Sequence, residues 1–193
     1  METHNLIKLL AKDTTAPRSG WLYALLVLGG IMLAMLTMGL MLEPREDIAY
    51  AIKQPAFQGK LSIFFLFGLC MLPMMAATGK PASKLRVVLP MLPLLWLLLA
   101  ASVHSLNRNW GSIAYELEWT DGLWCFLFIP IIALPAFDLF CRALRLLAPT
   151  ELDHAGRIAG IAAGSWAAFA YSIACTHDNP LYLTVWYLGA ILF

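Results

Sequence analysis

The chain has 193 residues, of which 61% are hydrophobic and 13% charged, with a mean hydropathy of +0.73 and a formal net charge of +1. An average soluble domain is about 45–50% apolar and about 25% charged. This composition excludes a disordered chain and a protein that binds nucleic acid through a basic surface. It also disfavours a soluble enzyme. It indicates an all-α polytopic membrane protein.

Residues 1–19 form the first predicted unit, a cytoplasmic tail that contains a short amphipathic helix. Its apolar positions fall on one side of the helix, with Lys8 and Lys12 opposite them; these positions are Leu6, Ile7, Leu9 and Leu10. Two readings stay open for this helix. It lies on the anionic inner leaflet of a membrane, or it docks into the groove of a cytosolic partner.

Residues 20–193 form the second predicted unit, a domain of six transmembrane helices. A helix that crosses a bilayer needs about 20 apolar residues. The apolar stretches between the charged residues predict spans near 21–42, 61–78, 87–103, 122–140, 158–175 and 181–193. The last stretch would reach only roughly 20 Å, so it is either a partial span or part of a shortened chain.

The distribution of basic residues predicts the orientation of these spans. With the N-terminus inside, the inner segments hold nine lysines and arginines and the outer loops hold four, Arg45, Lys53, Lys60 and Arg108. Cytoplasmic loops carry the excess of positive charge in membrane proteins. A cytoplasmic N-terminus is therefore expected.

The fifth predicted span carries small residues at a strict spacing of four. They are Gly156, Gly160, Gly164, Ala168 and Ser172, and beside them runs the alanine row Ala155, Ala159, Ala163 and Ala167. Such stripes let a second helix approach closely. We expect a tight helix crossing at Gly156, Gly160 and Gly164, either inside the bundle or between the protomers of a homodimer.

Two of the four cysteines are expected to lie at the same level of the membrane. Cys125 is near the outer end of the fourth span, and Cys175 is at the outer end of the fifth, its antiparallel neighbour. With His177 and Asp178 they offer thiolate, imidazole and carboxylate to a thiophilic metal, although the spacing is not that of a usual metal motif. The alternative is that both cysteines are small buried hydrophobic residues.

One carboxylate, Asp138, lies within a span, where an acid suggests a proton or ion pathway. Arg142 lies four residues further on, so a local ion pair is the favoured interpretation. A small transporter or channel is the alternative function, but it would need more polar groups in mid-span. Nucleotide-binding and hydrolase motifs are absent from the sequence, so no enzyme and no resident cofactor are expected.

With these residues in place, the sequence resembles the NrsF family, the negative regulators of sigma F. Several short motifs carry the resemblance in an order and spacing that are specific together. They are Leu6-Ile7, Leu10-Ala11-Lys12-Asp13, Pro17-Arg18, Pro55-Ala56-Phe57 with Lys60, Cys125, Ile129-Pro130, Ala133, Pro135, Ala148-Pro149-Thr150, Ala155-Gly156, Tyr171, Cys175, Asp178, Pro180 and Trp186-Tyr187. The chain departs from the family in Ala174-Cys175-Thr176-His177-Asp178, where His-Cys-Pro-Glu-Asp is common.

The resemblance implies a six-span anti-sigma factor of the bacterial inner membrane. Such a protein holds an extracytoplasmic-function sigma factor until a heavy metal or an oxidant reaches two cysteines, which carry over onto Cys125 and Cys175. The tail is the expected sigma-factor contact through Leu6, Ile7, Leu9, Leu10 and Asp13.

Overall fold

The structure, a computed structural model, describes residues 19–78, 88–106, 108–117, 119–149 and 151–193. Within these ranges every regular element is helical and no strand is present, so the predicted all-α class is confirmed. The predicted sigma-factor contact residues of the tail lie outside the described ranges; they are Leu6, Ile7, Leu9, Leu10 and Asp13.

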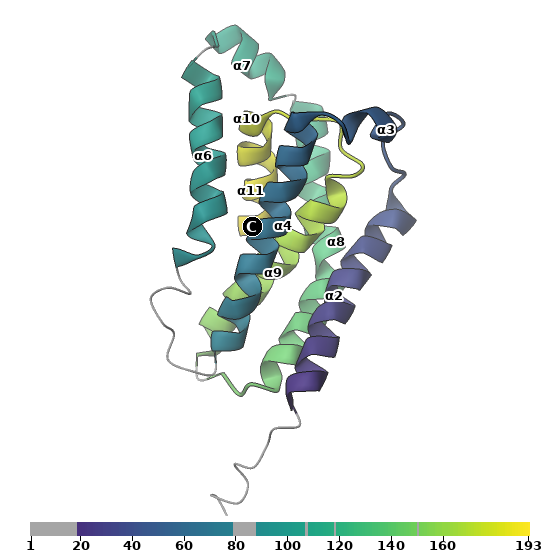
Figure 1. The fold of residues 1–193 in the computed structure, drawn as a ribbon, viewed down its shortest axis with the longest axis vertical. Helices are drawn as coiled ribbons and strands as arrows, with labels where there is room; N and C mark the ends of the chain where they lie inside the picture. Colours follow the sequence, from purple (N-terminus) through teal and green to yellow (C-terminus); the bar gives the residue numbers. More distant parts are fainter. Residues whose placement is uncertain (1–18, 79–87, 107, 118, 150) are drawn as a thin grey trace, which may run out of the picture.

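Long helices that alternate in direction build one bundle (Figure 1). They are α2 (Ser19–Met41), α4 (Pro55–Ala77), α6 (Met91–Leu106), α8 (Trp119–Arg145) and α9 (Leu152–Tyr171). The short helices α3 (Ile48–Ala51) and α7 (Trp110–Glu116) lie at the end of the bundle opposite the start of α2. We call this the α3 end.

The chain finishes in one continuous helical stretch that begins at the α3 end. It consists of α10 (Pro180–Tyr182), the π-helical turn η1 (Leu183–Tyr187) and α11 (Leu188–Leu192). The Asn179 side chain accepts a hydrogen bond from the Leu181 N–H at 2.9 Å, and Pro180 occupies the first helical position. This cap and proline are a usual helix start, because proline needs no hydrogen-bond partner there.

The prediction of six spans requires a correction. Among the described residues three helices are long and apolar enough to cross a membrane, namely Gly20–Met41, Pro55–Ala77 and Trp119–Arg145. The 16 residues of α6 reach about 24 Å, short of a hydrocarbon core of about 30 Å. The stretch Pro180–Leu192 is likewise short, and α9 carries Asp153, His154 and Arg157 near its start.

The core lies where α8 and α9 pack together, with α2 against both of them and α4 against α9. The most buried face belongs to α9, whose alanine row Ala155, Ala159, Ala163 and Ala167 is fully enclosed. By contrast, α6 stands at the side of the bundle and contacts mainly α10 and α4 (Figure 1).

The predicted glycine stripe makes a close helix crossing at one of its three positions. A Cβ on Gly164 would lie 3.3 Å from Ile191 Cα, whereas one on Gly160 would be in ordinary contact with Phe137 at 3.9 Å. A Cβ on Gly156 would meet nothing within 4 Å. On α9, close approach to other helices of the chain therefore depends on the alanine row and Gly164, and the homodimer stays a prediction.

Candidate functional site

The structure brings together the two cysteines that the sequence placed at one level. Cys125 lies in the second turn of α8, and Cys175 lies in the connection 172–179 between α9 and α10. Their Sγ atoms are 3.9 Å apart, and both side chains are buried. Cys70 and Cys141 are half-buried on α4 and in the second half of α8. A disulfide would require the two close sulfurs to approach by roughly 1.9 Å more.

The final helical stretch packs against this thiol pair through Tyr182. The Tyr182 hydroxyl lies 3.1 Å from Cys125 Sγ, and the His177 ring stacks on the Tyr182 ring with centroids 4.5 Å apart. Because Asn179 and Pro180 start the helix only two residues before Tyr182, they set where its side chain enters the core. Tyr182 was not among the residues predicted from sequence, and no local pattern distinguishes it from a packing tyrosine.

The four residues predicted as metal ligands do not converge on one point. The Asp178 carboxylate is bound by two cations, with Lys60 Nζ at 2.7 Å and Arg45 Nη1 at 3.0 Å. His177 Nε2 lies 3.2 Å from Asp121 Oδ2. Across the residues that the structure describes, no group of three or more His, Cys, Asp or Glu side chains is placed to hold a metal ion. The arrangement thus offers a soft metal two sulfurs, without an evident third ligand.

Two charged residues, Lys60 and Arg45, lie beside the thiol pair, and neither was predicted from the sequence as a site residue. Lys60 Nζ donates hydrogen bonds to the carbonyl oxygens of Cys175 at 2.9 Å and of His177 at 3.0 Å. The sequence marked Lys60 only as a motif position and a loop charge. A lysine in the second turn of a long apolar helix was the signal that could have identified it.

A second polar cluster joins α6, α7 and the connection 172–179 at the α3 end. Glu116 Oε2 lies 2.7 Å from His104 Nε2 and accepts a hydrogen bond from Asn179 Nδ2 at 2.6 Å. Arg108 Nε lies 3.3 Å from Glu116 Oε1. The pKa of the Glu116 carboxyl is lowered, most strongly by the hydrogen bond with His104. The hydrogen bond from Asn179 and the charge of Arg108 lower it further.

This cluster predicts a pH dependence of stability. A carboxyl group with a lowered pKa in the fold stabilises it above the unfolded pKa of about 4.3 and loses that contribution as pH falls through the folded value. We expect Glu116→Gln to lower Tm at pH 7 by about 2 to 4 °C, near 1 kcal/mol in a chain of this size. Thermal unfolding of both proteins in detergent between pH 7 and pH 3.5 measures the effect.

The difference between wild type and Glu116→Gln should shrink as pH falls below the unfolded pKa of about 4.3, because the carboxyl of the unfolded chain takes up its proton before that of the folded protein. Glu46→Gln, at an exposed position, is the matched control and should leave Tm unchanged. A Tm difference that stays constant down to pH 3.5 would contradict the prediction that ionised Glu116 stabilises the fold.

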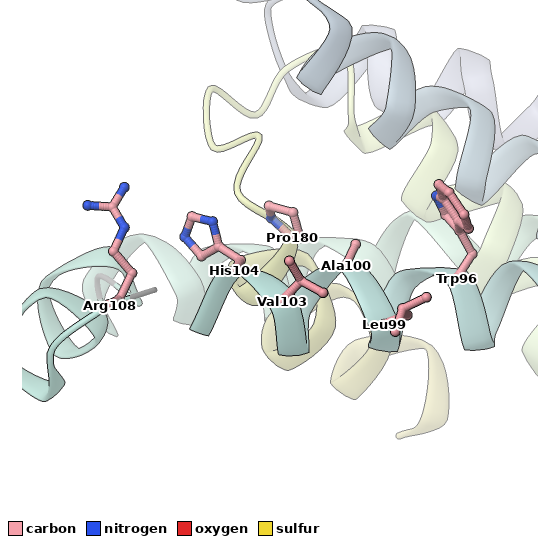
Figure 2. A pocket seen from close by; sticks show the side chains of 7 residues that line it. All are labelled: Trp96, Leu99, Ala100, Val103, His104, Arg108 and Pro180. Carbon is pink, nitrogen blue, oxygen red and sulfur yellow. The ribbon is translucent and has the colours of Figure 1, made fainter. Parts of the chain in front are cut away.

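The pocket beside α6 is separate from the thiol pair. It has a volume of about 590 Å³ and is lined by Trp96, Leu99, Ala100, Val103, His104, Arg108 and Pro180 (Figure 2). Figure 2 shows the apolar side chains along one side of α6, with His104 and Arg108 at one end of the row. No cysteine lines it, so it gives no access to the sulfurs.

The ion pair predicted on the fourth span is confirmed. Arg142 Nε lies 2.8 Å from Asp138 Oδ2, and both side chains are more than half exposed on the bundle surface. An exposed, paired carboxylate does not form part of an internal ion pathway, which would need buried polar groups facing one another.

Comparison with known proteins points to a family of regulators. The family model NrsF, negative regulator of sigma F, matches residues 10–193. A probable anti-sigma-F factor NrsF of Azospira oryzae is 28% identical over 201 residues, which cover 100% of this chain and 92% of that protein. The anti-sigma-F factor NrsF of Caulobacter vibrioides is 27% identical over 203 residues, with the same coverage. No solved structure matches the chain.

Proposed function

The chain belongs to the NrsF family of negative regulators of sigma F, and from this premise we propose that it is a membrane-embedded anti-sigma factor controlled by its thiol pair. Anti-sigma factors are regulatory proteins and not enzymes. The observation that carries the proposal is the family match over residues 10–193, nearly the whole chain. The partner is a sigma factor, which we propose to be of the extracytoplasmic-function type.

A location in the bacterial inner membrane, with several passes through it, is supported by the surface of the bundle. The outward side of α2 is apolar along its whole length, with Trp21, Leu25, Leu28, Met32 and Leu36 all exposed. Soluble monomers rarely expose a continuous apolar surface of this extent. In this proposal membrane lipid covers it, the N-terminus is cytoplasmic, and the α3 end faces outward.

The signal in this proposal acts on Cys125 and Cys175. An oxidant removes two electrons and two protons from the two thiols as the sulfur–sulfur bond forms. The support is the separation of 3.9 Å between two sulfurs that lie 50 residues apart in the chain. A thiophilic heavy metal is the second signal proposed, bound through the two thiols alone.

Affinity capture of the tagged protein from native membranes tests this function. Membranes are prepared with and without a hydroperoxide or cadmium, and captured proteins are identified by mass spectrometry. A sigma factor that co-purifies from untreated membranes and is released by treatment is the expected result. Absence of any sigma factor under both conditions would contradict the proposal.

The tail provides a prediction of its own. Leu6→Asp combined with Leu10→Asp is expected to reduce the captured sigma factor at least about tenfold, because burial of each leucine is worth about 1.5–3 kcal/mol. The yield of sigma factor per captured protein is the measurement.

Lys8→Gln combined with Lys12→Gln is the matched control, since both double variants lower the charge of the tail by two. It should retain the sigma factor if the apolar side of the helix docks on the partner. Loss of sigma factor in the lysine variant, with retention in the leucine variant, would favour a helix on the anionic leaflet instead.

A further inference from the structure

The connection 172–179, which carries Cys175, is held by side chains from two other elements. Lys60 at the start of α4 donates to the carbonyl oxygens of Cys175 and His177, and its ammonium pairs with Asp178 Oδ1. The ammonium thus donates two hydrogen bonds to carbonyl oxygens, and a carboxylate balances its charge. We call Lys60, Arg45 and Asp178 the carbonyl anchor.

Arg45, between α2 and α3, completes the carbonyl anchor. Its Nη1 lies 3.0 Å from Asp178 Oδ2 and 3.5 Å from the Cys175 carbonyl oxygen. Its backbone N–H donates to the Ile173 carbonyl oxygen at 3.2 Å. The anchor therefore joins the ends of α2 and α4 to the segment that carries one of the two thiols.

Lys60 is held in place by its surroundings. Its side chain has an exposed fraction of 0%, and the ammonium lies over the rings of Phe57 and Tyr187 at 5.6 and 5.8 Å from their centroids. Removing an ammonium from water is costly unless it is paired and fully hydrogen-bonded. A lysine at this depth therefore has one favourable position, at the two carbonyl oxygens.

The two thiols depend on different supports. Cys125 belongs to α8, whose backbone hydrogen bonds fix its position. Cys175 belongs to a connection without regular structure beyond its first turn. The separation of the sulfurs therefore varies mainly with the position of the Cys175 backbone, which the carbonyl anchor determines.

We propose that Lys60 is the positioning residue of the thiol pair, holding the Cys175 backbone so that its sulfur stays beside that of Cys125. This inference rests on the sensor function proposed above and assigns the residue that sets how readily the pair closes. Holding two reacting groups together raises their effective concentration. The anchor thereby favours the disulfide over two separate thiols.

The thiol–disulfide equilibrium with glutathione tests this role. In that exchange the two protein thiols are oxidised to one disulfide, while one glutathione disulfide is reduced to two glutathione thiols. The purified full-length chain, carrying Cys70→Ser and Cys141→Ser, is equilibrated in detergent with glutathione mixtures. Acid quenching, alkylation and intact mass then give the oxidised fraction.

Lys60→Met is expected to lower the equilibrium constant at least about tenfold, because the effective concentration of the two thiols falls. Lys53→Met removes the same charge at an exposed position nearby, and the constant should change by less than about twofold. Lys60→Arg restores a cation and is expected to recover a large part of the loss. A general structural defect would lower Tm without this recovery.

An equal constant in Lys60→Met and Lys53→Met would overturn the proposal, as would a Lys60→Arg constant as low as that of Lys60→Met. Asp178→Asn serves if Lys60→Met does not fold, since it removes the carboxylate charge that pairs with Lys60 and Arg45 but leaves the Lys60 hydrogen bonds to the two carbonyl oxygens. Its constant should fall by about threefold, and an unchanged value would overturn the proposal.

The assay contains no sigma factor, so the two proposals fail separately. If Lys60→Met and Lys53→Met have equal equilibrium constants while the wild type still releases sigma factor, the role of the carbonyl anchor is wrong and the sensor function stands. If the equilibrium constant of Lys60→Met is lowered but the wild type releases no sigma factor, the role of the carbonyl anchor stands and the sensor function is wrong.

Discussion

Replacing Cys125 and Cys175 together by serine is expected to abolish the response of the regulator to oxidants and thiophilic metals. Serine is close in size to cysteine and its hydroxyl can keep the contact with Tyr182, so the bundle should fold. Without the two sulfurs no disulfide can form and no thiolate can bind a soft metal. A reporter gene under a sigma-dependent promoter should show an induction ratio near one, about the uninduced value.

Cys70→Ser combined with Cys141→Ser is the control for this experiment. Both of these cysteines are half-buried, Cys70 on α4 and Cys141 about 24 Å of helix after Cys125 on α8, so induction should match that of the wild type. An unchanged induction ratio in the Cys125 and Cys175 double variant would contradict the sensor function. It would leave the family membership intact, because that rests on the whole sequence.

Gly122→Ala is expected to cause the largest loss of stability from a single methyl group. A Cβ at this position would overlap the indole of Trp186. That indole cannot retreat easily, because its Nε1 donates to the Leu117 carbonyl oxygen at 2.8 Å and its ring packs edge-on against Trp119. Overpacking of this kind costs about 1–3 kcal/mol, or a fall in Tm of roughly 3 to 10 °C.

Gly156→Ala is the matched control, since a Cβ there meets nothing within 4 Å. Alanine is a better helix former than glycine by up to about 1 kcal/mol, so Tm should stay equal or rise. Thermal unfolding of the two variants in the same detergent makes the comparison. A larger loss in Gly156→Ala than in Gly122→Ala would reverse this assignment and favour a helix partner at Gly156.

Helix boundaries show how far a local pattern reaches. The apolar run predicted a span from residue 61, whereas α4 begins at Pro55 and includes Lys60 in its second turn. Hydropathy places a lysine outside a span because an isolated charge is costly in an apolar environment. In the fold this lysine is buried, since carbonyl oxygens from the connection 172–179 and the Asp178 carboxylate satisfy its charge.

The glycines likewise show that a sequence pattern does not predict which residues make close contacts between helices. The regular spacing in α9 indicated a crossing at three glycines, but only Gly164 meets a neighbouring backbone closely. Gly122 stands alone in its sequence context, yet it faces Trp186 at close range. Spacing along one helix reports which residues share a side, and it does not report which helix lies opposite.

The sequence by itself determined the helical class, the apolar segments and the level at which Cys125 and Cys175 lie, because hydropathy and helix rise are local properties of the chain. Only the tertiary structure decided that the two sulfurs approach to 3.9 Å and that Lys60 and Arg45 hold the Cys175 segment. These contacts join residues between 50 and 130 positions apart. Which of many compatible neighbours meet is settled by how the helices pack in three dimensions, where shape and the pairing of buried polar groups select one arrangement.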